Sequence, residues 1–272
     1  MSGGLIVTAD DLGLTAGISD GILEAHEHGI VTAASLMATG TDFERAVSRL
    51  AEHPALDVGV HLALDEERPL LGGLRTIVGA DGAFLTRGKL LLRLALRRVD
   101  LDEVEAVWEA EFARIVAAGL RPSFVNSHGH VHGHPSLFPI AVRLARRHGV
   151  PAIRRPVEAG WRGPAPDLAR AALVTASSRW SFARTRAPLR STDGFLGLVE
   201  SGRLDAGTLE RLIARTGGGV TELMAHPGRA DAETRRRYGH WGYRWEDELA
   251  ALTGIEPPAQ RLTTFLAEFP TL

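Results

Sequence analysis

The sequence contains no cysteine and almost no lysine, since Lys89 is the only lysine among 31 basic residues. The absence of cysteine excludes disulfide bonds, thiol nucleophiles and thiolate metal sites. Any metal ion must therefore be held by histidine, aspartate or glutamate. A chain without disulfides fits a reducing compartment, and we expect a cytoplasmic protein.

Long apolar runs and a strong charge of one sign are also missing. No run approaches the ~20 apolar residues that span a bilayer, and the residues before Asp10 lack the basic start of a signal peptide. The formal net charge is −2 at pH 7, so no overall field favours nucleic acid. We expect neither a membrane segment nor a nucleic-acid partner, and a homodimer is left open.

The 272 residues are 44% hydrophobic and 24% charged, which predicts one globular domain over residues 1–272. Short apolar or β-branched runs alternate with segments of helical periodicity, as in a (β/α) barrel or a doubly wound sheet. The predicted parallel strands are residues 5–9, 33–38, 57–62, 122–126, 151–153, 191–193 and 220–225.

Helix signals lie between these runs. Thr15 is a predicted N-cap, Asp100 with Glu103 resembles a capping box, and further helices are predicted from Pro135 and from Asp205. The least regular stretches are expected to be long loops over the active face: residues 66–90, 158–190 and 228–245.

Five of the apolar runs end in an ionisable or metal-binding cluster. Because the carboxyl ends of barrel strands converge on one face, we expect these clusters to meet there. They are Asp10 with Asp11, His61, the series from His128 to His134, Arg154 with Arg155, and His226.

Single members of this set are weak signals. An aspartate pair is typical of a helix cap or a solvated turn, and a lone histidine such as His61 or His226 is often structural. A stronger signal is the period-two series of histidines at His128, His130, His132 and His134. In an extended chain alternate residues lie on the same side, so several imidazoles would face one point, and such a group of imidazoles indicates a metal site.

The blocks TADDLG, the strand-end His61, NSHGHVH and ELMAHPG resemble, in order, the signatures of the YdjC/ChbG-like carbohydrate deacetylases, distant relatives of the NodB-type polysaccharide deacetylases. Leu12 stands where the family commonly has phenylalanine, and Gly129 where some members have histidine. The resemblance implies a deformed (β/α) barrel of about seven parallel strands. It also implies removal of an N-acetyl group from an amino sugar or glycoconjugate.

The resemblance further implies a role for each site residue. Asp11, His61 and His128 become ligands of one divalent metal, Asp10 the base, and His226 the acid or an oxyanion stabiliser. The remaining residues are expected to bind substrate: Arg154 and Arg155 (one of which could instead position the base), His130, His132 and Trp241. Two histidines and one aspartate suit Zn²⁺, Fe²⁺ or Co²⁺, whereas members of the family are often described with Mg²⁺.

Two segments carry weaker hypotheses. Trp241 lies in an aromatic stretch, with Tyr238, Tyr243 and Trp245, that would be either a platform for sugar rings or loop packing. Residues 89–98 are apolar and basic, with Arg93 and Arg97 predicted on one helical face. This segment is either an ordinary barrel helix or a membrane contact, as for the hopanoid-associated (HpnK-like) subgroup of the family.

Two other functions remain open. A related barrel could hydrolyse a phosphoester or a cyclic amide, although binuclear sites of that kind often use a modified lysine, and Lys89 is not at a strand end. A non-catalytic sugar-binding barrel is the second alternative, but a mere binder has no need of a base such as Asp10.

Overall fold

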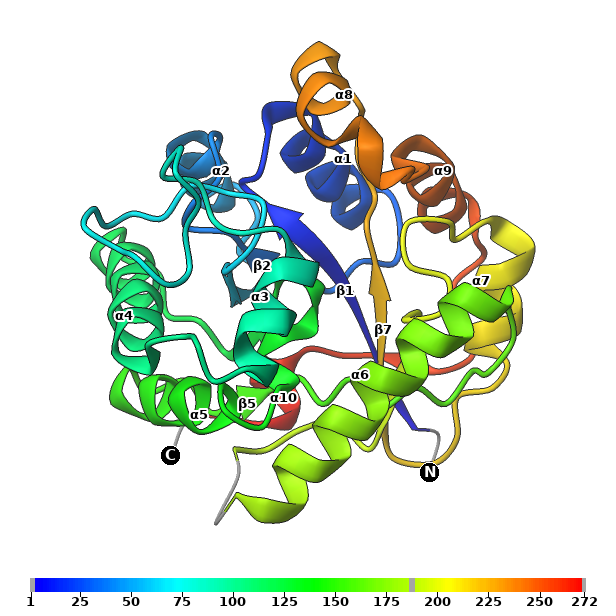
Figure 1. Cartoon of the computed structure of the whole chain (residues 1–272). Helices are drawn as coiled ribbons and strands as arrows, with labels where there is room; N and C mark the ends of the chain where they lie inside the picture. Colours follow the sequence, from blue (N-terminus) through cyan, green and yellow to red (C-terminus); the bar gives the residue numbers. More distant parts are fainter. Residues whose placement is uncertain (1–2, 186–188, 271–272) are drawn as a thin grey trace.

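A curled parallel sheet forms the centre of the computed structural model, which describes residues 3–185 and 189–270. The strand order is β5-β4-β3-β2-β1-β7-β6, and a short β8 pairs with β1. Figure 1 shows β1 and β7 running side by side through the middle of the molecule. The strands are β1 (Gly4–Leu12), β2 (Ala33–Leu36), β3 (Asp57–Leu62), β4 (Phe124–Ser127), β5 (Ala152–Ile153), β6 (Gly194–Leu196), β7 (Val220–Ala225) and β8 (Arg261–Leu262).

Helices alternate with the strands and surround the sheet (Figure 1). The long ones are α1 (Ala16–Glu27), α4 (Leu101–Ala117), α5 (Phe138–Arg147), α6 (Ala165–Arg184) and α9 (Trp245–Gly254). The shorter ones are α2 (Phe43–Leu50), α3 (Arg87–Ala95), α7 (Ala206–Ile213), α8 (Ala232–Tyr238) and α10 (Phe265–Glu268), with 3-10 turns η1 (His128–Gly133) and η2 (Gly239–Trp241).

The two edge strands, β5 and β6, do not pair with each other. The chain between them makes single parallel bridges instead, one from Arg190 to Ala152 of β5 and one from Glu158 to Phe195 of β6. The sheet therefore curls most of the way round without a closing ladder. This confirms the predicted deformed barrel of about seven parallel strands.

The N-caps predicted at Thr15 and Asp100 are confirmed, and the helix predicted from Asp205 is present as α7. The side chains of Thr15, Asp100 and Asp205 each accept a backbone hydrogen bond at the start of α1, α4 and α7. The predicted capping box of α4 is wrong in its second half. Glu103 instead accepts hydrogen bonds from the backbone N–H groups of Arg75 and Thr76, so it fixes a loop rather than the cap.

Two other expectations are wrong. The strand predicted at residues 191–193 is displaced to Gly194–Leu196, where Phe195 and Leu196 are buried. The stretches 158–190 and 228–245 are not simply loops, since they contain α6 and α8. Helix α6 escaped detection because the side chains it buries are small, so no large apolar stripe marks its face: Ala171, Thr175, Ser178 and Ser181.

Helix α3 covers most of the basic apolar segment but ends before Arg97, whose φ of 54° is left-handed. Arg93 and Arg97 therefore do not share a helical face, and Arg93 donates a hydrogen bond to the Thr76 carbonyl. Leu92 and Leu96 are 60% and 53% exposed. None of the helices in the described ranges is long and apolar enough to cross a membrane.

Candidate active site

A bulge in β1 brings both carboxylates of the aspartate pair close to His61. Ala9 pairs with Ala34 of β2 and Leu12 with Leu36, so Asp10 and Asp11 together oppose one residue. Asp11 has a φ of 71°, a left-handed conformation that side-chain-bearing residues rarely adopt. Successive strand residues normally face opposite ways, and the bulge removes this obstacle to a shared site.

Asp11, His61 and His128 form a buried three-residue cluster. Each offers one ligand atom, and these atoms lie within 4.8 Å of one another. Asp11 Oδ1 is 3.1 Å from His61 Nε2 and 3.1 Å from His128 Nδ1. Asp11 Oδ2 and His61 Nε2 are buried and have no hydrogen-bond partner within the described part of the chain.

The orientation of His61 is set by its other ring nitrogen. His61 Nδ1 lies 2.7 Å from Asn126 Oδ1 and 2.9 Å from Ser35 Oγ. The Asn126 amide nitrogen donates to Asp10 Oδ1 at 3.0 Å, which fixes its oxygen toward His61. A carboxamide oxygen only accepts, so His61 Nδ1 carries the proton.

The second ring nitrogen, Nε2, is then left with a lone pair that faces the Asp11 carboxylate. Two acceptors in contact are stable only with a proton or a cation between them. Metal-bound histidines are held by an acceptor at the other nitrogen in this way, so the residues present fit a divalent cation with two nitrogen ligands and one oxygen ligand.

Asp10 is held beside this cluster by charge. Its carboxylate accepts from Arg154 at 2.5 and 2.9 Å and from Ser35 Oγ at 2.8 Å. Burial raises the pKa of Asp10, but the Arg154 guanidinium, followed by His61, lowers this pKa to about 2. Arg154 is fully buried and also pairs with Glu222 at 2.7 Å. Asp10 is thus ionised at neutral pH and cannot rotate away.

The histidine series is not extended, so the expectation that several of its imidazoles face one point is wrong. It forms the 3-10 turn η1, in which Gly129 and His130 have φ values of 57° and 59°. His128 alone of the four joins the cluster with Asp11 and His61. The segment bends where Arg87 packs against Gly129, in the space that a Cβ would fill.

The other histidines of the series have different surroundings. His132 is fully buried, with its ring hydrogen-bonded to Ser127 Oγ at 2.7 Å and to the Arg154 carbonyl at 3.1 Å. Its pKa is lowered to about 3, mainly by burial. It therefore stays neutral and supports the backbone of Arg154. His130 and His134 line the cavity.

His226 follows β7 and lines the same cavity. Its backbone N–H donates to the buried Glu248 carboxylate, and its Nδ1 has no partner among the described residues. Burial lowers the pKa of His226 to about 4, against the opposing effect of Asp11 and Asp10. The imidazole is therefore neutral at pH 7.

The cavity above these residues has a volume of about 390 Å³. Asp10, His61, His128 and His226 form its polar floor, and α3, η1 and α6 supply an apolar wall, which comprises Leu91, Ala95, Val131, Leu173 and Val174. An outer recess of about 230 Å³ adjoins it, with Arg87, His128, Arg170, Ser201 and Tyr243 lining both.

The aromatic stretch has two functions in the structure. Tyr238 and Trp245 are buried and pack the chain against the barrel. Trp241 and Tyr243 line the outer recess, and the Trp241 ring lies 4.9 Å from that of His128. Arg155 packs against Phe182, 5.6 Å from the ring centre, and is not among the residues that line the cavity.

Sequence reasoning missed the residues that support the site. Ser35 and Asn126 orient His61 and Asp10, Glu222 shares Arg154, and Glu248 holds His226. Three of them are polar residues inside apolar strands, a signal that could have found them. Glu248 lies on α9 among exposed acidic residues, and nothing in its spacing marks it.

The fold and this site together define a class: a (β/α) barrel with a buried Asp-His-His cluster and a second carboxylate at the carboxyl ends of its strands. The model of the YdjC-like protein family matches residues 4–260, so the chain belongs to the YdjC-like family.

Two relatives and one solved structure illustrate the similarity. A protein from Geobacillus stearothermophilus named carbohydrate deacetylase is 34% identical over 251 residues, which are 91% of this chain and 88% of that protein. A protein of the same name from Brevibacillus brevis is 42% identical over 147 residues, which are 54% of this chain and 57% of that protein. The match with this chain therefore spans little more than half the length of the Brevibacillus protein. A structure from Enterococcus faecalis V583, provisionally described as a cellobiose-phosphate cleavage protein, superposes with a TM-score of 0.79 and 25% identity, covering 99% of this chain and 100% of that one.

Proposed function

We propose that this protein removes the N-acetyl group from an N-acetylated amino sugar or glycoconjugate, with one divalent metal ion held by Asp11, His61 and His128. The observation that carries the proposal is the contact between His61 Nε2 and Asp11 Oδ1 at 3.1 Å, beside the ionised Asp10. The relatives named carbohydrate deacetylase support the substrate class. The single three-residue cluster found in the described ranges favours a mononuclear site over a binuclear hydrolase.

A bound ion supplies Lewis acidity at an amide carbonyl and makes water more acidic. Asp10 is the proton acceptor, since its carboxylate is ionised and fixed by Arg154. Because its pKa is low, Asp10 is a weak base, and it removes a proton more readily from water made acidic by a bound ion than from bulk water. His226 faces the same cavity as a neutral imidazole, so it serves as the donor to the leaving amine only after it takes up the proton that Asp10 has accepted from water.

The roles of the predicted substrate-binding residues divide according to their positions. His130 and Trp241 line the cavity and the recess, and we assign them to substrate. Arg154 and His132 are fully buried and paired within the protein, and we assign them to positioning Asp10. Arg155 packs outside the cavity, and we assign it no contact with substrate.

The proposed activity is tested by acetate release from N-acetylglucosamine oligomers. Turnover is expected to disappear after treatment with a chelator and to return when one divalent ion is added back. The two nitrogen ligands favour Zn²⁺, Fe²⁺ or Co²⁺ over Mg²⁺, which prefers oxygen, so parallel additions identify the ion. Full turnover in the chelated protein would contradict the proposal.

A further inference from the structure

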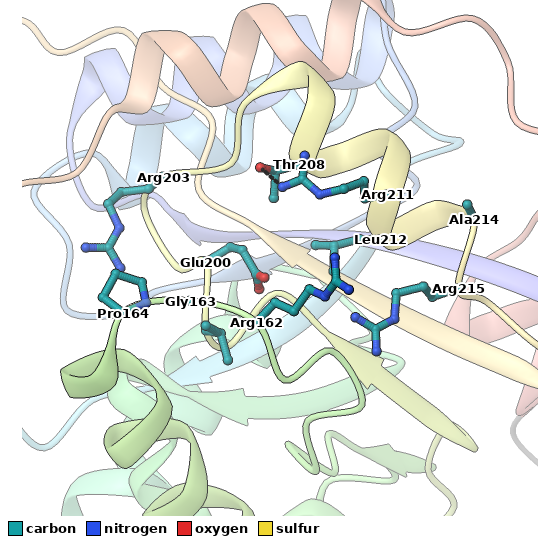
Figure 2. Close-up of a pocket in the computed structure, with 11 residues that line it drawn as sticks. Arg162, Gly163, Pro164, Glu200, Arg203, Thr208, Arg211, Leu212, Ala214 and Arg215 are labelled. Carbon is teal, nitrogen blue, oxygen red and sulfur yellow. Dashed lines mark hydrogen bonds between the residues drawn. The ribbon is translucent and has the colours of Figure 1, made fainter.

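A second and larger cavity, of about 590 Å³, lies between the start of α6, the loop after β6, and α7 (Figure 2). None of the residues assigned to the reaction lines it. Four of its lining residues are arginines, and one is acidic. The lining comprises Arg162, Gly163, Pro164, Val199, Glu200, Arg203, Thr208, Arg211, Leu212, Ala214 and Arg215.

The four arginines differ in how many hydrogen bonds and ion pairs their guanidinium groups make within the protein. Arg203 pairs with Asp167, and Arg211 is tied to α7 by hydrogen bonds to the Gly207 carbonyl and to Thr208. Arg215 makes one long hydrogen bond, 3.4 Å, to the Ala159 carbonyl.

The Arg162 backbone N–H donates to the Gly160 carbonyl, but its guanidinium makes no hydrogen bond or ion pair with any residue in the described ranges. The guanidinium groups of Arg162 and Arg215 are therefore the two left available at this cavity, and Figure 2 shows both side chains at its edge.

Glu200 cancels only part of this positive charge near neutral pH. Its Oε2 atom is buried and has no hydrogen-bond partner within the described part of the chain. Burial, followed by the carboxylate of Glu158, raises the pKa of Glu200 to about 7, against the opposing effect of Arg211 and Arg215. Near neutral pH a large share of this carboxyl group is protonated, and it can then donate a hydrogen bond to an anion.

We propose that this cavity binds a tetrahedral dianion of the phosphate or phosphomonoester type, with Arg162 and Arg215 as its principal ligands and Glu200 as a hydrogen-bond partner. Guanidinium groups bind phosphate oxygens through paired N–H donors. The residues of this site take no part in the deacetylation chemistry; binding of free phosphate is independent of the proposed function, whereas binding of a phosphate carried by the sugar substrate rests on it.

One loop separates this cavity from the catalytic one. Glu200 lines the arginine cavity, Ser201 lines the catalytic cavity, and Arg203 lines both the arginine cavity and the outer recess. An anion bound here thus lies next to the route to the metal cluster. The anion is either free phosphate or a phosphate group carried by the sugar substrate, and binding measurements distinguish these two sources.

The test is calorimetric titration of the whole protein with inorganic phosphate at constant ionic strength, with chloride as the blank. The double variant Arg162→Gln/Arg215→Gln should weaken phosphate binding by about tenfold or more, because two charge-assisted contacts are lost. Arg179→Gln, which changes an exposed arginine in the middle of α6, is the matched control and should bind like the wild type. The altered side chains are exposed, and unchanged melting temperatures verify the fold.

Two further arms complete the design. Tighter binding of N-acetylglucosamine 1-phosphate than of inorganic phosphate indicates a substrate-borne anion, and equal binding indicates a free one.

The role of Glu200 is tested with sulfate, whose charge does not change near neutral pH. Sulfate should bind more tightly as the pH falls from about 8 to about 6, and Glu200→Gln should remove this dependence of the affinity on pH. The charged groups around Glu200 are Glu158, Arg211 and Arg215, which act on its pKa, and Arg162 and Arg203, which line the same cavity. Phosphate binding no stronger than chloride, or equal in the double variant and the wild type, would overturn the proposal.

Discussion

The Asn126 carboxamide oxygen lies 2.7 Å from His61 Nδ1 and thereby decides which nitrogen of His61 is free for a metal ion. Asn126→Leu removes this acceptor, so the imidazole can flip or change tautomer. We expect metal affinity to fall by about 10- to 100-fold, measured by competition with a chromophoric chelator. Ser123→Ala, which removes a hydrogen bond to Asp57 near the other end of β4, is the control. Equal affinities in the two variants would contradict this role of Asn126.

Asp10→Asn should separate catalysis from metal binding. The replacement keeps the size of the side chain but cannot accept a proton. We expect acetate release to fall by about 10²- to 10⁴-fold, the usual contribution of a general base, while metal content measured by atomic absorption stays the same. If turnover persists near the wild-type rate, Asp10 is not the base.

Replacing Arg154 should lower the free energy of unfolding more than replacing any surface arginine. It is fully buried and bonded to both Asp10 and Glu222. Arg154→Met leaves two buried carboxylates without their cation, and we expect the free energy of unfolding in urea to drop by about 3–5 kcal/mol. Adding Glu222→Gln to Arg154→Met should recover part of the loss. A loss no larger than that of Arg236→Gln, on the exposed side of α8, would show that the network contributes little.

Glu111 should make the protein less stable as the pH rises. It is fully buried on α4, accepts one hydrogen bond from the Ala63 N–H, and its pKa lies well above 4.5 because of burial. Above pH 4.5 the unfolded chain loses this proton while the folded protein keeps it. Stability therefore falls with rising pH, by about 1.4 kcal/mol for each unit of pKa shift, until the folded pKa is passed.

Glu111→Gln keeps an acceptor for Ala63 and cannot ionise. The variant should be more stable than the wild type at pH 7, with a flatter dependence of unfolding free energy on pH between about 4.5 and 8. Glu52→Gln, whose side chain is 70% exposed, serves as the control. Parallel curves for wild type and Glu111→Gln would rule out this explanation.

Trp241 should affect binding of the sugar rather than the chemical step. Its ring lines the outer recess beside His128, and Asp10 does not line that recess. Trp241→Ala is expected to raise KM for an N-acetyl sugar severalfold, with kcat and melting temperature nearly unchanged, because a stacking surface is lost. Trp180→Ala, at an exposed position on α6, is the control. An unchanged KM would remove Trp241 from the substrate site.

The sequence by itself determined the alternation of strands and helices and the polar clusters at the strand ends, and the resemblance of its blocks to the YdjC-like family implied the barrel and the candidate ligand set. Apolar strands that end in polar clusters have to bring those clusters to one face, because parallel strands share a direction. Which three residues form the cluster was implied by the family resemblance, and the structure brings Asp11, His61 and His128 together. Helix α4 was predictable too, since its large apolar residues recur at helical spacing.

Only the tertiary structure decided how the site is oriented. The bulge that brings Asp10 and Asp11 close to His61 depends on the pairing of β1 with β2. The 3-10 turn that leaves His128 alone at the cluster depends on contacts such as that between Gly129 and Arg87. Arg154 meets Asp10 across 144 positions of sequence. Such contacts arise from packing between distant strands, for which no local spacing in the sequence provides a signal.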